Sequence, residues 1–145
     1  MLALIQLVSH ANVNIDEHQI AVIGRGILAL IGLEKTDTEK EAEKMLNRIS
    51  NYRIFPDDEG KMNRSLMDIQ GGLLLVPQFT LVAETNQGTR PGFSRGMQPE
   101  SGKKLFDYFV SFAQGQYANI AAGVFGANMQ VSLCNDGPVT FILRT

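Results

Sequence analysis

The sequence contains little that would indicate a secreted, disulfide-bonded or membrane protein. It has one cysteine, Cys134, and no tryptophan among its 145 residues. A single cysteine forms neither an internal disulfide nor a CxxC metal site, which favours a reducing compartment. The start MLALIQLVSH lacks the basic region and cleavage site of a signal peptide, and no apolar run is long enough to span a bilayer. We therefore expect a soluble cytoplasmic protein without membrane contact.

Positive and negative charges nearly balance in this sequence. The formal net charge is −2, with 44% hydrophobic and 19% charged residues, and the pI is about 5.6. This balance is typical of one globular domain, which we assign to residues 1–145. It argues against indiscriminate binding of nucleic acid through bulk charge, so a nucleic-acid partner would require a local basic patch.

Residues that bind metals are few. The only histidines are His10 and His18, and the acidic run Asp57-Asp58-Glu59 lacks the alternate-residue spacing of a calcium loop. We interpret this run as a solvated turn after Pro56 and expect no metal and no cofactor.

The stretch 73–81, LLLVPQFTL, begins as a strand and then breaks off. Residues 73–76 form an apolar run typical of a strand that is covered on both faces. Pro77 cannot donate a ladder hydrogen bond, so pairing should fail there and leave the N–H groups of Gln78, Phe79 and Thr80 free to face a ligand. The plainer alternative is an edge strand with a kink and a solvated threonine.

Periodicity predicts further strands and two helices. We expect strands at 2–8, 13–15 and 52–55, and a hairpin of 20–23 with 27–33 around Gly24-Arg25-Gly26. Apolar residues recur at helical spacing up to Asn51, after a capping box formed by Thr36 and Glu39. A second helix should begin at Pro99 and end at Gly115, with its aromatic side chains in the core.

The segment 84–98, ETNQGTRPGFSRGMQ, has no periodicity and is expected to be a long loop, which is often functional. Arg90 and Arg95 lie in it, and Lys103 and Lys104 follow closely. These four cations are the best candidates for a phosphate-facing patch. The alternative is a solvated basic loop.

Residues 129–133 alternate as in a half-buried strand, and residues 139–143 form another. The segment between them, Asn135-Asp136-Gly137-Pro138, is expected to be a turn. A peptide bond before proline adopts the cis form at modest cost, about 0.5–1 kcal/mol. The turn could therefore present its backbone carbonyls in fixed directions, although an ordinary hairpin turn is the more frequent outcome.

Several short motifs together resemble bacterial D-aminoacyl-tRNA deacylases. These are YRIF at 52–55, GKMN at 60–63, QFTL at 78–81, RPGFSRG at 90–96, MQVSL at 129–133 and NDGPVT at 135–140. The resemblance covers the whole chain without large insertions. The chain departs from the family pattern at Leu7 and Pro77, where members usually have arginine and serine.

The resemblance implies a mixed α/β fold with mixed β-sheets and two helices packed on one side. It also implies a homodimer with active sites at the subunit interface, acting on the 3′ end of aminoacyl-tRNA. Carried over to this sequence, it assigns catalysis to Gln78, Phe79 and Thr80, and substrate binding to Phe125, Met129, Gly137 and Pro138. Gly137 and Pro138, with a cis bond, would exclude L-aminoacyl groups while D-aminoacyl and glycyl groups are admitted.

The residues present favour a mechanism without a protein nucleophile. An aminoacyl-tRNA ester is activated, so its hydrolysis needs an oriented water and a stabilised oxyanion. A threonine nucleophile needs a base, and neither histidine lies in a motif, so the substrate's own 2′-hydroxyl is the better activator of water. Cys134 also lacks a histidine in its motif, and we interpret it as a partly buried structural residue.

A second hypothesis is a non-catalytic nucleic-acid-binding dimer of the same fold. Some eukaryotic relatives are described as binding DNA at replication origins. The acidic pI disfavours this reading.

Overall fold

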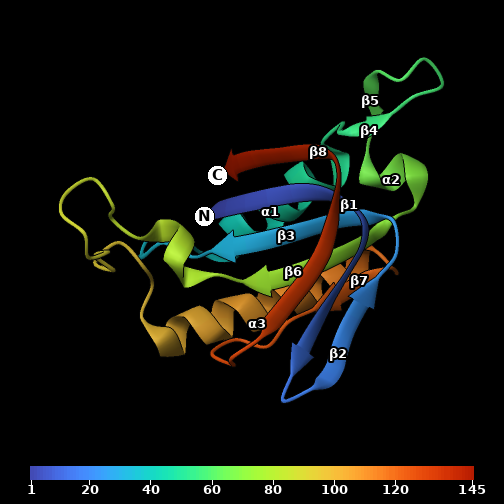
Figure 1. Ribbon diagram of the computed structural model, residues 1–145. Coiled ribbons are helices and arrows are strands. Elements are labelled where there is room, and N and C mark those ends of the chain that lie inside the picture. The colour runs from blue at the N-terminus through green and yellow to red at the C-terminus, as the bar shows by residue number, and fades with distance from the viewer.

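A computed structural model describes all residues from Met1 to Thr145. Its elements in chain order are β1 (Leu2–Ile15), β2 (His18–Ile23), β3 (Gly26–Gly32), α1 (Glu39–Asn51), β4 (Phe55–Pro56), β5 (Met62–Arg64), α2 (Leu66–Ile69), β6 (Gly72–Pro77), the 3-10 helix η1 (Phe79–Val82), α3 (Pro99–Gln116), β7 (Ile120–Ala122) and β8 (Gln130–Arg144). Figure 1 shows them from the face of the sheet that the long helices leave open.

The main sheet has 6 strands and mixed directions. Its order is β2-β1-β3-β6-β7, with β8 also paired to β1. Strand β1 is antiparallel to β2, β3 and β8, whereas β3, β6 and β7 run parallel. The central strand β6 is buried from Gly72 to Val76. This position confirms the prediction of a covered strand at 73–76, because a strand between parallel neighbours is buried on both faces.

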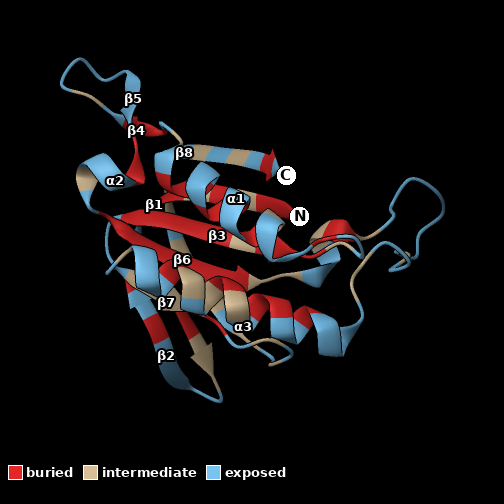
Figure 2. Ribbon diagram, turned by 180° about the vertical axis from the view of Figure 1, so that it is seen from behind, coloured by how far each residue is buried: buried red, intermediate tan, exposed pale blue.

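The helices α1 and α3 cover one face of the sheet, as Figure 2 shows from behind. Each has an apolar stripe at helical spacing, which it turns to a cluster of 22 buried residues. The stripe residues are Ala42, Met45, Leu46 and Ile49 on α1 and Leu105, Phe106, Phe109 and Ala113 on α3. The predicted α/β class with two helices on one side is confirmed, with the short α2 in addition.

The start of α1 differs from the prediction. Its N-cap is Thr38, whose N–H donates to Glu41 Oε2 at 3.0 Å, so the capping box is not formed by Thr36 and Glu39. The reason is a turn just before the helix, in which Asp37 is buried and accepts from the Glu34 N–H at 2.7 Å. This turn places the helix N-cap two residues later than expected, at Thr38 and not at Thr36.

Strands β1 and β8 are each continuous where two separate strands were predicted. Their ladder contains bulges, because Val8 lies opposite Asn135 and Gln6 lies opposite Thr140. At such a shift the set of side chains facing each side changes. Ile5 and Leu7 therefore pack under the helices, whereas Ala11 and Val13 belong to a second cluster of 8 buried residues. Ser9, His10 and the polar residues of 135–138 resemble turns in sequence because they lie at these irregular parts of the ladder, where most side chains are exposed.

The hairpin predicted around Gly24-Arg25-Gly26 is wrong. Strands β2 and β3 do not pair with each other but follow one another along β1. The actual hairpin joins β1 to β2 through Asp16 and Glu17, whose φ angles are 46° and 66°, as in a primed turn. Gly26 is needed for another reason, since an added Cβ would collide with the Gly72 carbonyl of β6.

Strands β4 and β5 form a small arm, visible at the upper right in Figure 1. The strand predicted at 52–55 is reduced to Phe55–Pro56, because only Phe55 finds a ladder partner in Arg64 before the register shifts. The acidic run between β4 and β5 is a solvated turn, as predicted. Asp57 Oδ1 accepts there from the N–H groups of Glu59 and Lys61. None of the helices is long and apolar enough to cross a membrane.

Candidate functional site

The strand β6 leads directly into the candidate site. Its ladder with β3 ends at the pair Ile31 and Pro77, as expected from the missing proline N–H. The prediction that the Gln78 N–H is free is wrong, because it donates to Ile31 O at 2.7 Å. Phe79 and Thr80 are the first two residues of η1, so their N–H groups have no acceptor within that helix. They remain the candidate oxyanion donors.

The side chains of Gln78 and Thr80 are joined. The amide nitrogen of Gln78 donates to the Thr80 hydroxyl oxygen, and both residues lie at the end of β6 where the chain turns into η1. Neither a histidine nor a carboxylate is hydrogen-bonded to Thr80. The arrangement can therefore orient the hydroxyl, but it offers no base that would make it a nucleophile.

A cavity of about 470 Å³ lies beside this turn. It brings together four of the residues predicted for the site, since Gln78, Phe79, Phe125 and Met129 all line it, with Met97 and with Pro99, the first residue of α3. Thr80 does not line it. Most of its wall is apolar, with Gln78 and Asn128 as the polar side chains. Such a lining suits a small organic group held by a few oriented polar contacts.

Gly137 and Pro138 do not line this cavity. They lie in the bulge of β8, opposite Leu7 of β1, and their peptide bond is cis. Strands β1 and β3 separate β8 from β6, which corresponds to about 14 Å of sheet at three strand spacings. Within one chain the predicted site residues therefore form two groups, one at the cavity and one at the bulge.

The bulge is closed by side chains that sequence reasoning did not select. Asn135 Oδ1 accepts from the Val139 N–H at 3.2 Å, and Asn135 Nδ2 donates to Thr140 Oγ1 at 2.9 Å. Gln6 Nε2 donates to the same oxygen at 3.3 Å. Asn135 and Thr140 belong to the NDGPVT motif, so the sequence signal was present. Their partners became evident only from the strand register.

The two departures from the family pattern lie at structural positions. Leu7 is 3% exposed and packs in the cluster under the helices. Pro77 is the last paired residue of β6 and also lines the cavity. Both residues have mainly apolar surroundings, so neither position needs a polar side chain to pair with a neighbour.

The loop 84–98 folds back beside η1. Glu84 and Gly92 exchange backbone hydrogen bonds of 2.7 and 2.9 Å, and the Lys35 N–H donates to Arg95 O at 3.2 Å. The Phe93 ring lies 5.1 Å from that of Phe79, which is itself 61% exposed. This aromatic pair was not foreseen, because nothing in the sequence indicates that residue 93 returns to residue 79.

Three of the four cationic side chains predicted to contact tRNA form ion pairs with carboxylates of the same chain. Arg95 pairs with Glu34 at 2.8 Å, Lys103 with Asp107 at 2.5 Å and Lys104 with Glu100 at 2.9 Å. Arg90 has no ion pair, and together with Arg95 it lines a hollow that contains no hydrophobic residue. Burial would raise the pKa of Glu34, but the Met1 ammonium and the Arg95 guanidinium hold it below its usual value.

Cys134 is exposed, which corrects the expectation of a partly buried cysteine. It lies on the solvent side of β8, directly across the ladder from His10. No hydrogen bond joins the two, since the His10 ring is bonded to Ser9 Oγ at 3.1 Å. The proximity of a histidine could not be read from the sequence, where the two residues are far apart.

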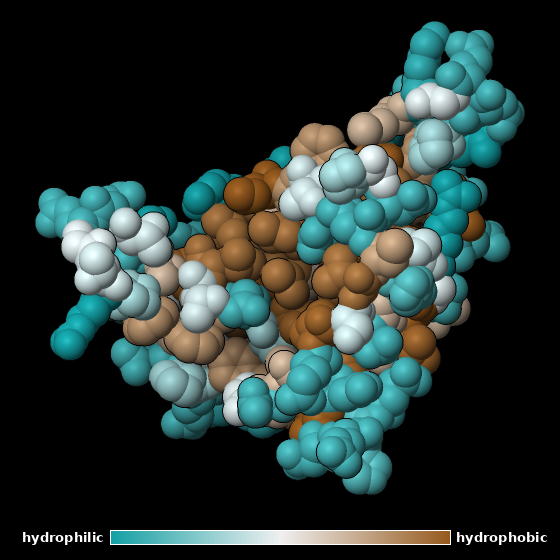
Figure 3. All heavy atoms as spheres, viewed as in Figure 1, coloured by the Kyte–Doolittle hydropathy of each residue, from teal (hydrophilic) through white to brown (hydrophobic).

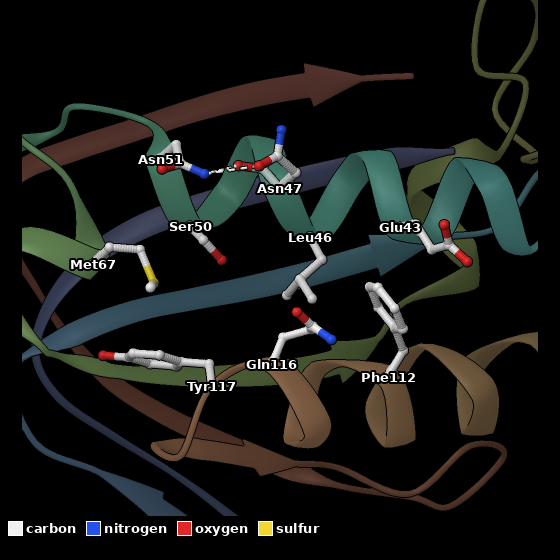
Figure 4. A pocket seen from close by; sticks show the side chains of 9 residues that line it. All are labelled: Glu43, Leu46, Asn47, Ser50, Asn51, Met67, Phe112, Gln116 and Tyr117. Carbon is white, nitrogen blue, oxygen red and sulfur yellow. Dashed lines mark hydrogen bonds between the residues drawn. The ribbon is translucent and has the colours of Figure 1, made fainter.

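A separate groove of about 300 Å³ lies between α1 and α3 on the other side of the sheet (Figure 4). It contains none of the predicted residues. Its polar groups are one carboxylate, a serine and a tyrosine hydroxyl and several amides, and Asn51 Nδ2 donates to Asn47 within it. With neither a cation nor a paired acid and base, it is a poor candidate for hydrolysis. No group of three or more histidine, cysteine, aspartate or glutamate side chains is positioned to hold a metal ion.

Comparison with known proteins identifies relatives along the whole chain. A curated D-aminoacyl-tRNA deacylase from Pseudoalteromonas translucida is 55% identical over 143 residues, covering 99% of both chains. One from Pseudomonas aeruginosa is 52% identical over 145 residues, covering 100% of both.

Solved structures agree with this fold. One described as a c-Myc DNA unwinding element binding protein has a TM-score of 0.95 at 40% identity, covering 100% of this chain and 99% of that one. A probable eukaryotic D-amino acid tRNA deacylase has a TM-score of 0.86 at 16% identity, covering 99% and 98%, and shows the fold alone. The family model described as D-Tyr-tRNA(Tyr) deacylase matches residues 4–144. The chain therefore belongs to the D-Tyr-tRNA(Tyr) deacylase family.

Proposed function

We propose that the protein hydrolyses the ester bond of D-aminoacyl-tRNA, releasing free tRNA and the D-amino acid. Family membership and the names of the most similar relatives support this reaction. The observation that carries it is the start of η1, where the N–H groups of Phe79 and Thr80 have no acceptor within the helix and where Gln78 and Phe79 line a cavity of about 470 Å³. Backbone donors at such a break can stabilise the oxyanion that forms when water attacks the ester carbonyl.

The side chains at this break have positioning roles. Gln78 donates to the Thr80 oxygen, which leaves the Thr80 O–H free to donate to the substrate. The ribose 2′-hydroxyl of the tRNA then activates the attacking water, because the protein supplies no base at this point. Phe125 and Met129 line the apolar wall against which the aminoacyl group packs.

The functional unit is a homodimer in which the bulge of one copy reaches the cavity of the other. In one chain Gly137 and Pro138 are about 14 Å of sheet away from β6, so they cannot complete their own cavity. The helix-free face between them carries an apolar row of paired residues, Ile142, Leu4 and Leu30. Figure 3 shows the apolar area at the centre of this face.

An apolar row on an otherwise polar surface suits burial against a second copy. Ile142 is 61% exposed in the single chain. A two-fold arrangement over this face would bring each bulge toward the opposite cavity. There Gly137 and Pro138 exclude an L side chain and admit D-aminoacyl and glycyl groups.

The tRNA body is contacted by Arg90, Arg95, Lys103 and Lys104. Three of these are paired with carboxylates, but all of the pairs are on the surface. An exposed ion pair is worth only about 0–1 kcal/mol, so a phosphate can replace a carboxylate at little cost. This local patch compensates for the net charge of −2.

Parallel incubation with D-tyrosyl-tRNA and L-tyrosyl-tRNA tests the reaction. We expect rapid release of D-tyrosine and no release of L-tyrosine above the spontaneous rate. If D-tyrosyl-tRNA decays at the spontaneous rate, the protein is not a deacylase.

The second hypothesis is a non-catalytic nucleic-acid-binding dimer. It is supported by the 40% identical structure that is described as a DNA unwinding element binding protein. Tight binding of duplex DNA by a protein that leaves D-tyrosyl-tRNA intact would favour this second function. The acidic composition and the cavity beside η1 favour the deacylase.

A further inference from the structure

The bulge that carries Gly137 and Pro138 has almost no backbone support from its own sheet. Gln6 pairs with Thr140 and Val8 pairs with Asn135, so residues 136–139 lie opposite Leu7 alone. Looped-out residues of this kind lose their ladder hydrogen bonds. Their position must be maintained by other contacts.

Those contacts come from the residues at the two ends of the bulge. Asn135 spans it, accepting from the Val139 N–H at 3.2 Å and donating to Thr140 Oγ1 at 2.9 Å. Thr140 Oγ1 also accepts from Gln6 Nε2 at 3.3 Å. The Thr140 oxygen thus receives both amides, which uses its two lone pairs.

Val139 connects the hydrogen bonds of Asn135 and Thr140 to the hydrophobic core. Its side chain packs against the helix-side cluster, and its Cγ2 lies where a Cβ on Gly137 would approach to 2.7 Å. The Asn135 bond to the Val139 N–H therefore orients the residue that presses on Gly137. No charged side chain is hydrogen-bonded anywhere in the bulge.

We infer that Asn135 and Thr140 are positioning residues that set the discrimination between D- and L-aminoacyl-tRNA. They act by holding the Gly137-Pro138 turn rigid, not by touching the substrate. The inference rests on the proposed deacylase function, in which this turn excludes the L side chain. A rigid obstacle excludes by collision, so loosening it should admit the L substrate as well as slow the D substrate.

The test compares the kcat/KM values for D-tyrosyl-tRNA and L-tyrosyl-tRNA in wild type and variants. Asn135→Ala removes both Asn135 hydrogen bonds, and Thr140→Val removes the acceptor while keeping the shape. Because Asn135→Ala removes two of the hydrogen bonds that hold the turn, we expect the D-to-L ratio to fall about tenfold. Part of this fall in the ratio should come from a measurable increase in kcat/KM for L-tyrosyl-tRNA.

Conservative controls separate positioning from general damage. Thr140→Ser keeps the hydroxyl and should restore the wild-type ratio. Ser132→Ala removes an exposed hydroxyl from the same strand that makes no hydrogen bond to the bulge, and should leave the ratio unchanged. Loss of folding would reduce cleavage of both substrates together and cannot raise the L rate.

Hydrogen exchange provides a readout that does not depend on activity. The Val139 amide should exchange faster in Asn135→Ala than in wild type, while amides in β6 keep their protection. Folded Asn135→Ala and Thr140→Val proteins with the wild-type ratio would overturn the inference and leave the deacylase function standing. A wild-type protein that does not cleave D-tyrosyl-tRNA would instead remove the proposed function, and the inference with it.

Discussion

The side-chain amide of Gln78 donates a hydrogen bond to the hydroxyl oxygen of Thr80, two residues later in the turn that ends β6. The bond occupies the oxygen as an acceptor and leaves the hydroxyl proton available for another partner. A nucleophile needs the reverse arrangement, in which a base accepts this proton. The geometry therefore favours orientation of the substrate or of water by Thr80.

Replacement of Thr80 by alanine tests this role by the size of its effect. Loss of one oriented hydrogen bond should lower kcat for D-tyrosyl-tRNA by about 10²-fold or less, whereas loss of a nucleophile should cost far more. Thr80→Ser should retain most of the activity. Ser111→Ala, at an exposed position of α3, is the control, and wild-type turnover in Thr80→Ala would exclude Thr80 from the mechanism.

Gly137 is needed for its backbone conformation. Its φ is +121°, and an added Cβ would lie 2.7 Å from Val139 Cγ2. Gly137→Ala should therefore destabilise the protein by roughly 1–3 kcal/mol, the usual range for such backbone strain. Gly24→Ala is the matched control, because an added Cβ there meets nothing within 4 Å. Equal urea midpoints for the two variants would show that the bulge relaxes without cost.

The proposed dimer depends on the apolar row of the helix-free face. Ile142→Lys places a charge at its most exposed member, opposite Leu4, and should convert the dimer to a monomer with much lower specific activity. Val22→Lys is the control, since Val22 is 56% exposed but lies on β2 outside the row. Size-exclusion chromatography with assays at each dilution gives the measurement. A fully active monomer would contradict the shared site.

Glu34 should make the stability depend on pH in a defined direction. Its pKa is lowered from 4.5 in the folded protein, because the Met1 ammonium and Arg95 outweigh the effect of burial. A lowered folded pKa stabilises above the unfolded value, and this stabilisation is lost as the pH falls from about 4.5 through the folded value. Since the Arg95 side chain is half exposed and solvent screens its pair with Glu34, we expect at most about 1 kcal/mol.

The corresponding measurement is urea denaturation of wild type and Glu34→Gln between about pH 3 and 7. The difference between the two curves should be largest near neutrality and shrink below about pH 4.5, as the linkage requires. Glu59→Gln, in the exposed arm, serves as the control. A difference that grows on acidification would show that the ionised Glu34 carboxylate does not stabilise the folded protein.

The elements that were predicted correctly are those whose pattern is local. Residues 73–76 form one uninterrupted apolar run, and the apolar stripes of α1 and α3 repeat at the helical period. Such local patterns are enough to predict the type of element and its buried side chains. The continuity of β1 and β8 could not be predicted, because a bulge exchanges the two faces and its polar residues resemble a turn. The error at residues 24–26 has a similar cause, since Gly26 marks a close approach to Gly72 of β6 and not a hairpin.

The sequence predicted four residues that line one cavity, but it did not predict how the candidate site is arranged. The motif around Gln78 and the positions Phe125 and Met129 meet at one cavity, which no spacing along the chain indicates. The separation of Gly137 from that cavity follows from β1 and β3 lying between β8 and β6. Strand order depends on long-range pairing, and single-sequence patterns carry little information about it.

The last prediction concerns glycine. A pocket selects D over L either by binding the D side chain or by excluding the L side chain, and a rigid obstacle is enough for exclusion. The cavity wall near η1 is formed mainly by apolar residues of ordinary size, without a charged group that would recognise a particular side chain. Glycine has no side chain to exclude, so the obstacle that stops L-alanine should let glycine pass.

We therefore expect the protein to cleave D-alanyl-tRNA and glycyl-tRNA and to spare L-alanyl-tRNA. The three substrates are best prepared on one tRNA body, so that contacts with Arg90 and the other cations are the same in each reaction. Comparable first-order rates for the D-alanyl and glycyl esters would indicate exclusion. Intact glycyl-tRNA beside cleaved D-alanyl-tRNA would show instead that the pocket binds the D side chain, and the role of Gly137 and Pro138 as an obstacle would then be wrong.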